Sequence, residues 1–249
     1  MLLVVFGYMF AQPPATDSKT FCAIDPSNIP GYTALLIDVS DQLSNAQKVR
    51  LEKELTSLGD VSEQRTSAFL NKGEKLDIYF LQPDGEEPTR VFSMCHPGNV
   101  NNRSFFNVLN EGEIFARKKW QEFSNKILGE IYLRVDESRD METSPLIETI
   151  KFIRADVFPR PSLIDASRPY RLLVWSDMIQ NSGLANHFTG LSDFEEVLKK
   201  TPLELTNIDV SVFHLMSPKY SKYQTSEQVA WWRRVFAFSR ANLNMWEPL

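Results

Sequence analysis

The stretch TALLIDVSD, residues 33–41, decides the fold prediction for this chain. Its first five residues form an unbroken apolar run, which is typical of a strand buried on both faces of a parallel sheet. The run stops at Asp38, and Ser40 and Asp41 follow. In open parallel sheets ligands bind beyond the carboxyl ends of the strands, so this stretch predicts both a central strand and the start of a binding site.

The pattern of a buried strand followed by a helix recurs along the chain. Apolar residues at 51, 55 and 58 have helical spacing, and Gly59 stands where a C-cap belongs. Further strands are predicted at 76–81, 90–94, 170–175, 208–213 and 245–249, and further helices at 111–135, 146–156, 192–200 and 224–242. The alternation predicts a three-layer, Rossmann-like α/β fold, with an open, mostly parallel sheet and helices on both faces.

Two local motifs refine this prediction. The turn sequence PDG at 83–85 joins the strands at 76–81 and 90–94 as a hairpin, so the sheet has one antiparallel edge strand. Ser144 and Pro145 precede the helix at 146–156, where a hydroxyl N-cap and a proline at the first helical position are common. Ser144 therefore has a structural explanation as well as a functional one.

Composition excludes several classes of function. The chain has 249 residues, 43% hydrophobic and 24% charged, with 27 basic against 32 acidic side chains and a net charge of −5. This balance provides no field for holding nucleic acid, so no nucleic-acid partner is predicted. Glycine-rich phosphate loops, the His-Glu-x-x-His motif, the Gly-x-Ser-x-Gly elbow and a Cys-x-x-Cys pair are all missing from the sequence. The common enzyme signatures are therefore absent.

The N-terminal residues 1–16 form an apolar segment without charge. A membrane-spanning helix needs roughly 20 apolar residues, whereas the apolar region of a signal peptide needs about 7 to 15. We therefore interpret 1–16 as an export or membrane-anchor segment and 17–249 as a single domain outside the cytoplasm. The alternative is an edge strand or an apolar tail that packs on the core.

Cys22 and Cys95 are the only cysteines in the sequence. A pair downstream of an export-like segment permits one structural disulfide. Two buried free thiols in a reducing compartment are the alternative, and the sequence leaves both open.

Oxygen-bearing side chains gather at the predicted carboxyl edge of the sheet. Asp38 and Ser40 follow the first strand, Asp177 follows the strand at 170–175, and Thr143 and Ser144 lie in the loop between them. Carboxylate and hydroxyl oxygens are the hard ligands that Mg²⁺ prefers. These residues predict a magnesium site, although each of them could instead cap a helix or shape a turn.

This arrangement resembles the von Willebrand factor A-like fold, in which an Asp-x-Ser-x-Ser loop, a Thr loop and an Asp loop build a metal-ion-dependent adhesion site. The resemblance implies that Asp38 and Ser40 form the first loop, Thr143 or Ser144 the second and Asp177 the third. It also implies that a partner's acidic side chain completes the coordination of the ion. Binding of another protein, rather than catalysis, is the role that follows from the resemblance.

The sequence departs from that family pattern in the first loop. Gln42 stands where the second serine is expected, and Asp41 adds a carboxylate beside it. A glutamine oxygen can bind a hard cation only if the side chain folds back toward it, so the site is predicted to be degenerate. Segments at 37–41, 92–98, 144–148 and 174–182 also resemble a little-characterised bacterial branch of these domains that carries an N-terminal export segment. That likeness implies a location in the periplasm or at a membrane.

Two further hypotheses concern what the chain acts on. Clustered aspartates could mark a metal-dependent phosphoester hydrolase, but Asp41 is the only obvious additional carboxylate, so a non-enzymatic binding module is favoured. The final predicted helix carries Trp231 and Trp232 beside Arg233 and Arg234, which indicates either deep burial or a docking face for a partner. Asp41, Trp231 and Trp232 are therefore the candidate partner-binding residues.

Overall fold

A computed structural model of the chain describes residues 14–57, 70–98, 113–136 and 141–249. Most of the predicted export segment lies outside this part, as do Leu58 and Gly59, which were expected to end the first helix. Within the described residues, no helix is long and apolar enough to cross a membrane.

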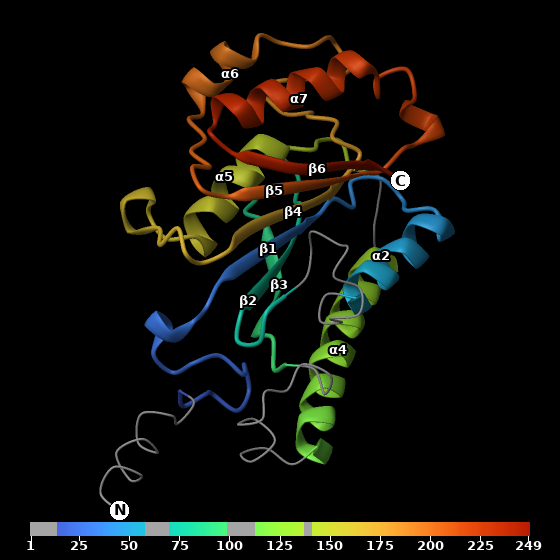
Figure 1. The fold of residues 1–249 in the computed structure, drawn as a ribbon. Coiled ribbons are helices and arrows are strands. Elements are labelled where there is room, and N and C mark those ends of the chain that lie inside the picture. The colour runs from blue at the N-terminus through green and yellow to red at the C-terminus, as the bar shows by residue number, and fades with distance from the viewer. Residues whose placement is uncertain (1–13, 58–69, 99–112, 137–140) are drawn as a thin grey trace, which may run out of the picture.

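Six strands form one sheet in the order β3-β2-β1-β4-β5-β6 (Figure 1). Their bounds are β1 (Tyr32–Ile37), β2 (Lys75–Phe80), β3 (Thr89–Cys95), β4 (Tyr170–Ser176), β5 (Asp209–His214) and β6 (Asn242–Pro248). Only β3 runs antiparallel to its neighbour, and the other four pairs are parallel. The prediction of a mostly parallel sheet with one antiparallel edge strand is therefore confirmed.

Helices cover both faces of the sheet (Figure 1). One face carries α2 (Asn45–Ser57) and α4 (Glu113–Asp136), and the other carries α5 (Leu146–Val157), α6 (Phe194–Lys200) and α7 (Ser226–Phe238). The side chains of β1 alternate between the two cores: Leu35 and Ile37 pack on the first face, and Ala34 and Leu36 on the second. This alternation confirms the three-layer architecture, because a strand with two apolar faces is stable only between two helical layers.

The register of the central strands places the predicted site. Ile37, the last residue of β1, is paired with Phe80 of β2 and Trp175 of β4. The Asp38 amide then donates to the Trp175 carbonyl oxygen at 2.8 Å. Because β1 and β4 end at the same level, the residues that follow them emerge side by side at the carboxyl edge of the sheet.

The final helix and strand differ in length from their predictions. The helix α7 spans 226–238 rather than 224–242, because Ser239 forms the C-cap and Arg240 adopts a left-handed φ of 60°. The chain then pairs with β5 from Asn242 onward, so β6 starts three residues before the predicted strand at 245–249.

The predicted start of α5 is also corrected. The N-cap is Pro145, which makes no side-chain capping bond, and Leu146 is the first helical residue. Ser144 is not the N-cap because its hydroxyl donates to Asp38 Oδ2 at 3.4 Å. The Ser144 hydroxyl therefore bonds to a residue at the carboxyl edge of the sheet instead of capping the helix.

The predicted disulfide between Cys22 and Cys95 is present in the structure. It joins the segment before β1, residues 14–31, to β3, and we call this segment the N-terminal arm. The Cys95 amide also donates to the Thr20 carbonyl oxygen at 2.8 Å. An edge strand with free backbone groups tends to pair with other chains. The arm covers part of this edge, and the covalent bond keeps it there.

An ion pair lies near the disulfide, at the amino end of the sheet. Glu74 is fully buried, and its Oε1 accepts from Thr33 Oγ1 and from an Arg171 guanidinium nitrogen, both at 2.5 Å. Glu74 Oε2 accepts from the Asn71 amide at 3.0 Å. This carboxylate thus has a cationic partner and hydrogen bonds to both oxygens, as a buried charge requires.

Candidate functional site

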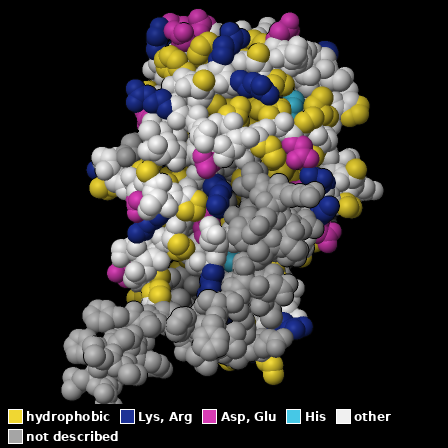
Figure 2. Space-filling view, in the orientation of Figure 1, with side chains coloured by type: hydrophobic (Ala, Val, Ile, Leu, Met, Phe, Trp, Pro, Cys, Tyr) yellow, Lys and Arg dark blue, Asp and Glu magenta, His cyan; other side chains and the backbone are white. Residues whose placement is uncertain are grey.

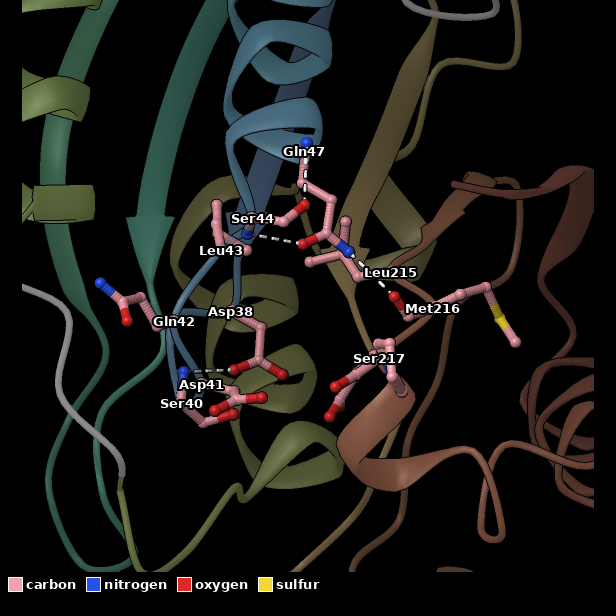
Figure 3. Close-up of a pocket in the computed structure, with 12 residues that line it drawn as sticks. Asp38, Ser40, Asp41, Gln42, Leu43, Ser44, Gln47, Leu215, Met216 and Ser217 are labelled. Atoms are coloured by element: carbon pink, nitrogen blue, oxygen red, sulfur yellow. Dashed lines mark hydrogen bonds between the residues drawn. The ribbon is translucent and has the colours of Figure 1, made fainter.

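A cavity of about 450 Å³ opens at the carboxyl edge of the sheet (Figure 3). It lies between the loops that follow β1, β4 and β5. Twelve residues line it: Asp38, Ser40, Asp41, Gln42, Leu43, Ser44, Gln47, Asp177, Leu215, Met216, Ser217 and Pro218. Polar side chains from the loops after three different strands therefore line one cavity, at the position where open α/β sheets bind ligands.

Asp38 is the most deeply placed carboxylate of the cavity, with 3% of the residue exposed. Its Oδ1 accepts from the Ser40 amide at 2.9 Å, and its Oδ2 accepts from the hydroxyls of Ser176 at 2.7 Å and Ser144 at 3.4 Å. Burial raises the pKa of Asp38, and the hydrogen bonds from Ser40 and Ser176 oppose this shift. All these donors are neutral, so they orient the carboxylate without compensating its charge.

Asp177 lies on the neighbouring loop with 8% of the residue exposed. Its Oδ1 accepts from the Ile179 amide at 2.8 Å. Burial raises the pKa of Asp177 well above its usual range, and the nearby Asp38 carboxylate raises it further. The two aspartates are close enough to repel each other, and neither forms an ion pair within the part of the chain that the structure describes.

A third carboxylate stands at the rim of the cavity. Asp41 Oδ1 lies 3.0 Å from Lys219 Nζ, which connects the loop after β1 to the segment after β5. Lys219 also contacts the ring of Tyr220. Lys219 is thus paired with Asp41 at the rim, and its charge lowers the pKa of Asp177 by less than the Asp38 carboxylate raises it.

The structure brings together some of the predicted metal ligands and separates others. Asp38, Ser40 and Asp177 line one cavity, and Ser144 reaches it through its bond to Asp38. Gln42 is exposed, and its side chain points away from Asp38 (Figure 3). Thr143 Oγ1 accepts from the Asp84 amide at 2.7 Å, so its hydroxyl bonds to the turn between β2 and β3 in this conformation.

Sequence reasoning did not select Ser176 or Ser217, although both belong to the site. Ser176 ends β4 and donates to Asp38, and Ser217 follows β5 and lines the cavity. The available signal was position, because both serines stand at or just beyond the carboxyl end of a parallel strand.

The docking prediction for the two tryptophans is wrong. Trp231 and Trp232 are 2% and 0% exposed, and their indole N–H groups donate to the Ser192 and Met178 carbonyl oxygens, both at 2.6 Å. They are core residues because their side of α7 faces the sheet. Hydrophobic side chains do gather over α6 and α7 (Figure 2), and the exposed aromatic residue of α7 is Phe238.

The donor set suits a small hard cation. The described residues contain no group of three or more His, Cys, Asp or Glu side chains placed to hold a metal ion. Two buried carboxylates and the hydroxyl of Ser40 nevertheless line the cavity, and Mg²⁺ commonly uses one or two carboxylates and keeps several waters. A cation between Asp38 and Asp177 would relieve the repulsion between the two carboxylates.

The strand order, the antiparallel edge strand and the Asp-x-Ser sequence after β1 are consistent with a von Willebrand factor A-like α/β fold. No protein-family profile matches the sequence, and no curated protein matches it.

Several solved structures are similar to this chain. Proximal thread matrix protein 1 from the mussel byssus has a TM-score of 0.40 and 10% identity, over 85% of this chain and 48% of that one. BatB from Bacteroides thetaiotaomicron has a TM-score of 0.37 and 10% identity, over 76% and 68%. An aerotolerance-related membrane protein from Bacteroides fragilis NCTC 9343 has a TM-score of 0.34 and 9% identity, over 74% and 66%. This chain thus spans about half of the mussel protein, and these scores do not bear on function.

Proposed function

We propose that this chain is a protein-binding module whose contact surface includes a divalent cation, Mg²⁺ by preference, at the carboxyl edge of the sheet. One observation carries the proposal: Asp38 and Asp177 are buried, face one open cavity and have only neutral hydrogen-bond donors among the described residues. Burying a charge is costly unless an opposite charge compensates it. A bound cation would supply that charge, and an open cavity leaves room for a partner.

Each residue of the cavity has a separate task in this proposal. Asp38 and Asp177 hold the cation, and Ser40 adds a hydroxyl oxygen at the same loop. Ser176 and Ser144 orient the Asp38 carboxylate through their hydroxyls. When bound, the cation would offer an open coordination position to an acidic side chain of the partner. The proposed site lacks the ligands expected from Gln42 and Thr143, so its affinity should be modest.

The rim of the cavity would contact the rest of the partner. Asp41 and Lys219 offer one charge of each sign beside the exposed side chain of Met216. A mixture of charged and apolar groups is typical of non-obligate protein interfaces. We therefore retain Asp41 as a partner-binding residue and place Lys219 and Met216 beside it.

The disulfide supports a location outside the cytoplasm. Disulfides form and persist in oxidising compartments and are rare in reducing ones. Cys22 and Cys95 are bonded, so we propose an extracytoplasmic protein, tethered to a membrane through the segment 1–16. Protease accessibility of the protein in intact cells, measured before and after release of the outer envelope, tests this location.

Calorimetric titration of Mn²⁺ and Mg²⁺ into the purified protein tests the cation site. We expect saturable binding by the wild type and its loss in Asp38→Asn and Asp177→Asn. The matched control is Asp165→Asn, because Asp165 accepts similar local bonds from Ser167 on an exposed turn. Equal binding by the wild type and Asp177→Asn, or none by the wild type, would contradict the proposal.

The protein-binding role needs its own measurement. A protein captured by the immobilised domain in Mg²⁺ should be released by EDTA and should not bind Asp177→Asn. The alternative, a metal-dependent phosphoester hydrolase, predicts turnover of bis(4-nitrophenyl) phosphate that disappears in Asp38→Asn. Such turnover would replace the binding role with a catalytic one.

A further inference from the structure

The backbone carbonyl groups of the Asp177 loop accept several side-chain hydrogen bonds. The Met178 oxygen accepts from Gln228 Nε2 at 2.7 Å and from Trp232 Nε1 at 2.6 Å. Gln228 and Trp232 are four residues apart on α7, so they project from the same face of the helix. That face of α7 is therefore bonded directly to the residue that follows Asp177.

The backbone carbonyl oxygen of Asp177 also lies within hydrogen-bond distance of three side-chain nitrogen atoms. His214 Nε2 lies at 3.1 Å, Gln224 Nε2 at 3.2 Å and Gln228 Nε2 at 3.5 Å. Gln228 is the only one of these three that also contacts Met178. It therefore bonds to both peptide groups at the turn.

The backbone at this turn has an uncommon conformation. Met178 has φ 60°, in the left-handed region that is strained for a residue other than glycine. The turn also sets two local bonds, from the Met178 amide to Ser176 Oγ and from the Ile179 amide to Asp177 Oδ1, both 2.8 Å long. A change in the Met178 conformation would consequently move the Asp177 carboxylate.

Packing alone does not explain a glutamine at position 228. Its side chain is fully buried, and its Oε1 has no hydrogen-bond partner in the described part of the chain. An unsatisfied buried polar atom destabilises the folded protein. An apolar side chain at position 228 would avoid that cost. It would leave neither carbonyl without a donor, because Trp232 still donates to the Met178 oxygen and His214 to the Asp177 oxygen.

We propose that Gln228 is a positioning residue for the cation site. Its amide holds the Met178 carbonyl and so maintains the left-handed turn that directs the Asp177 carboxylate toward Asp38. The effect on cation affinity rests on the proposed function, whereas the effect on the turn does not.

The variant Gln228→Met separates positioning from packing. We expect its Mn²⁺ affinity, measured by calorimetry, to fall about tenfold or more, as is usual when a residue behind a metal ligand is lost. Its melting temperature should stay the same or rise, because the buried unpartnered oxygen is removed. The matched control is Ser239→Ala, which removes another buried oxygen without a described partner, at the other end of α7. This control should gain stability in the same way and bind Mn²⁺ like the wild type.

Amide hydrogen exchange of Ile179, followed by NMR without metal, tests the turn independently. We expect exchange to be about tenfold faster in Gln228→Met and unchanged in Ser239→Ala, because the bond to Asp177 Oδ1 weakens only in the first. Gln228→Leu is a second apolar variant for both measurements if Gln228→Met does not fold.

The outcomes distinguish the two proposals. If the wild type binds no Mn²⁺ but Ile179 exchange accelerates in the variant, the cation site is refuted and the role of Gln228 in holding the turn stands. If the variant binds Mn²⁺ as tightly as the wild type and Ile179 exchange is unchanged, the positioning role is refuted. A variant that loses both stability and Mn²⁺ affinity would show Gln228 to be a packing residue.

Discussion

Glu74 at the amino end of the sheet and Asp177 at its carboxyl end are both buried carboxylates, but their partners differ. Glu74 bonds to the guanidinium of Arg171, the hydroxyl of Thr33 and the amide of Asn71. Asp177 accepts one backbone amide, and the charge that affects it most is a second carboxylate, Asp38, while the effect of Lys219 is smaller. The chain thus pairs one buried carboxylate with its own guanidinium, and the other pair of carboxylates is where we propose that a cation binds.

The surroundings of Glu74 and Asp177 also differ, because the amino end of the sheet is covered and the carboxyl end is open. The amino end is closed by the disulfide between Cys22 and Cys95 and by the arm that covers β3. The carboxyl end opens into the cavity of about 450 Å³. We therefore propose that one end of the sheet provides stability and the other provides binding, and four experiments test this division.

Removing the disulfide should have the largest effect. The double variant Cys22→Ser with Cys95→Ser releases a loop of 73 residues, which costs about 4 kcal/mol in the chain-entropy treatment. Urea denaturation measures this loss against the oxidised wild type. Mn²⁺ affinity should stay unchanged under conditions where the variant is folded, since the bond lies at the opposite end of the sheet. A weaker Mn²⁺ affinity in the folded variant would show that the two ends are coupled.

Removing the cationic partner of Glu74 should come next. Arg171→Met leaves a buried carboxylate without its ion pair and should lower the free energy of unfolding by about 3 kcal/mol. Lys199→Met is the control, because Lys199 pairs with Glu196 at 2.6 Å on the exposed surface, where an ion pair contributes little to stability. Equal losses in the two variants would mean that Glu74 is not a structural charge.

Neutralising Asp177 at the carboxyl end of the sheet should raise the stability of the protein, whereas the two preceding changes lower it. Asp177→Asn removes the repulsion with Asp38 and should stabilise the metal-free protein at pH 7 by on the order of 1 kcal/mol. Burial raises the pKa of Asp177, so the folded protein retains this proton to a higher pH than the unfolded chain does. The stability from this group is complete below its ordinary pKa of about 4 and is lost as the pH rises through the folded-state pKa.

The pH dependence needs a difference measurement because other groups titrate in the same range. Burial lowers the pKa of His96 and His187 to about 4, so these residues make the protein less stable as the pH falls from about 6.5 to 4. Subtracting the melting temperatures of Asp177→Asn from those of the wild type cancels this contribution. The gain of the variant should shrink toward pH 4 and disappear when Mg²⁺ is added at pH 7. A pH-independent difference would remove the electrostatic basis of the site.

The smallest effect is expected at Thr143. Its hydroxyl accepts from the Asp84 amide, so Thr143→Val should cost less than about 1 kcal/mol and change Mn²⁺ affinity by less than about twofold. A tenfold loss of affinity would show that this hydroxyl turns toward the cavity when the cation binds. The residue would then join the site, as its position in the sequence predicted.

The fold was predictable because its determinants are local. The run at 33–37 carries no charge and is apolar from Ala34 onward, which identifies a strand covered on both faces, and the residues after it must then lie at the edge of the sheet. The same reasoning identified the strand that precedes Asp177. Hydrophobic periodicity was enough to place these elements to within a few residues.

The side-chain directions at the site were less predictable because they depend on contacts between distant segments. The Thr143 hydroxyl is taken by a turn 59 residues earlier, and the Ser144 hydroxyl by a strand end 106 residues earlier. Gln42 lines the cavity but points away from Asp38, from a loop that carries no periodic signal. The burial of Trp231 was among the alternatives, but the choice depended on which side of α7 faces the sheet.

The placement of the N-terminal arm and the cavity at opposite ends of β1 has a mechanical consequence. A pull between the arm and a partner held at Asp38 would load β1 along its own axis. The covalent backbone of β1 would carry this tension, because both attachment points lie on that strand. The ladders that pair β1 with β2 and with β4 over six residues each would therefore not have to shear.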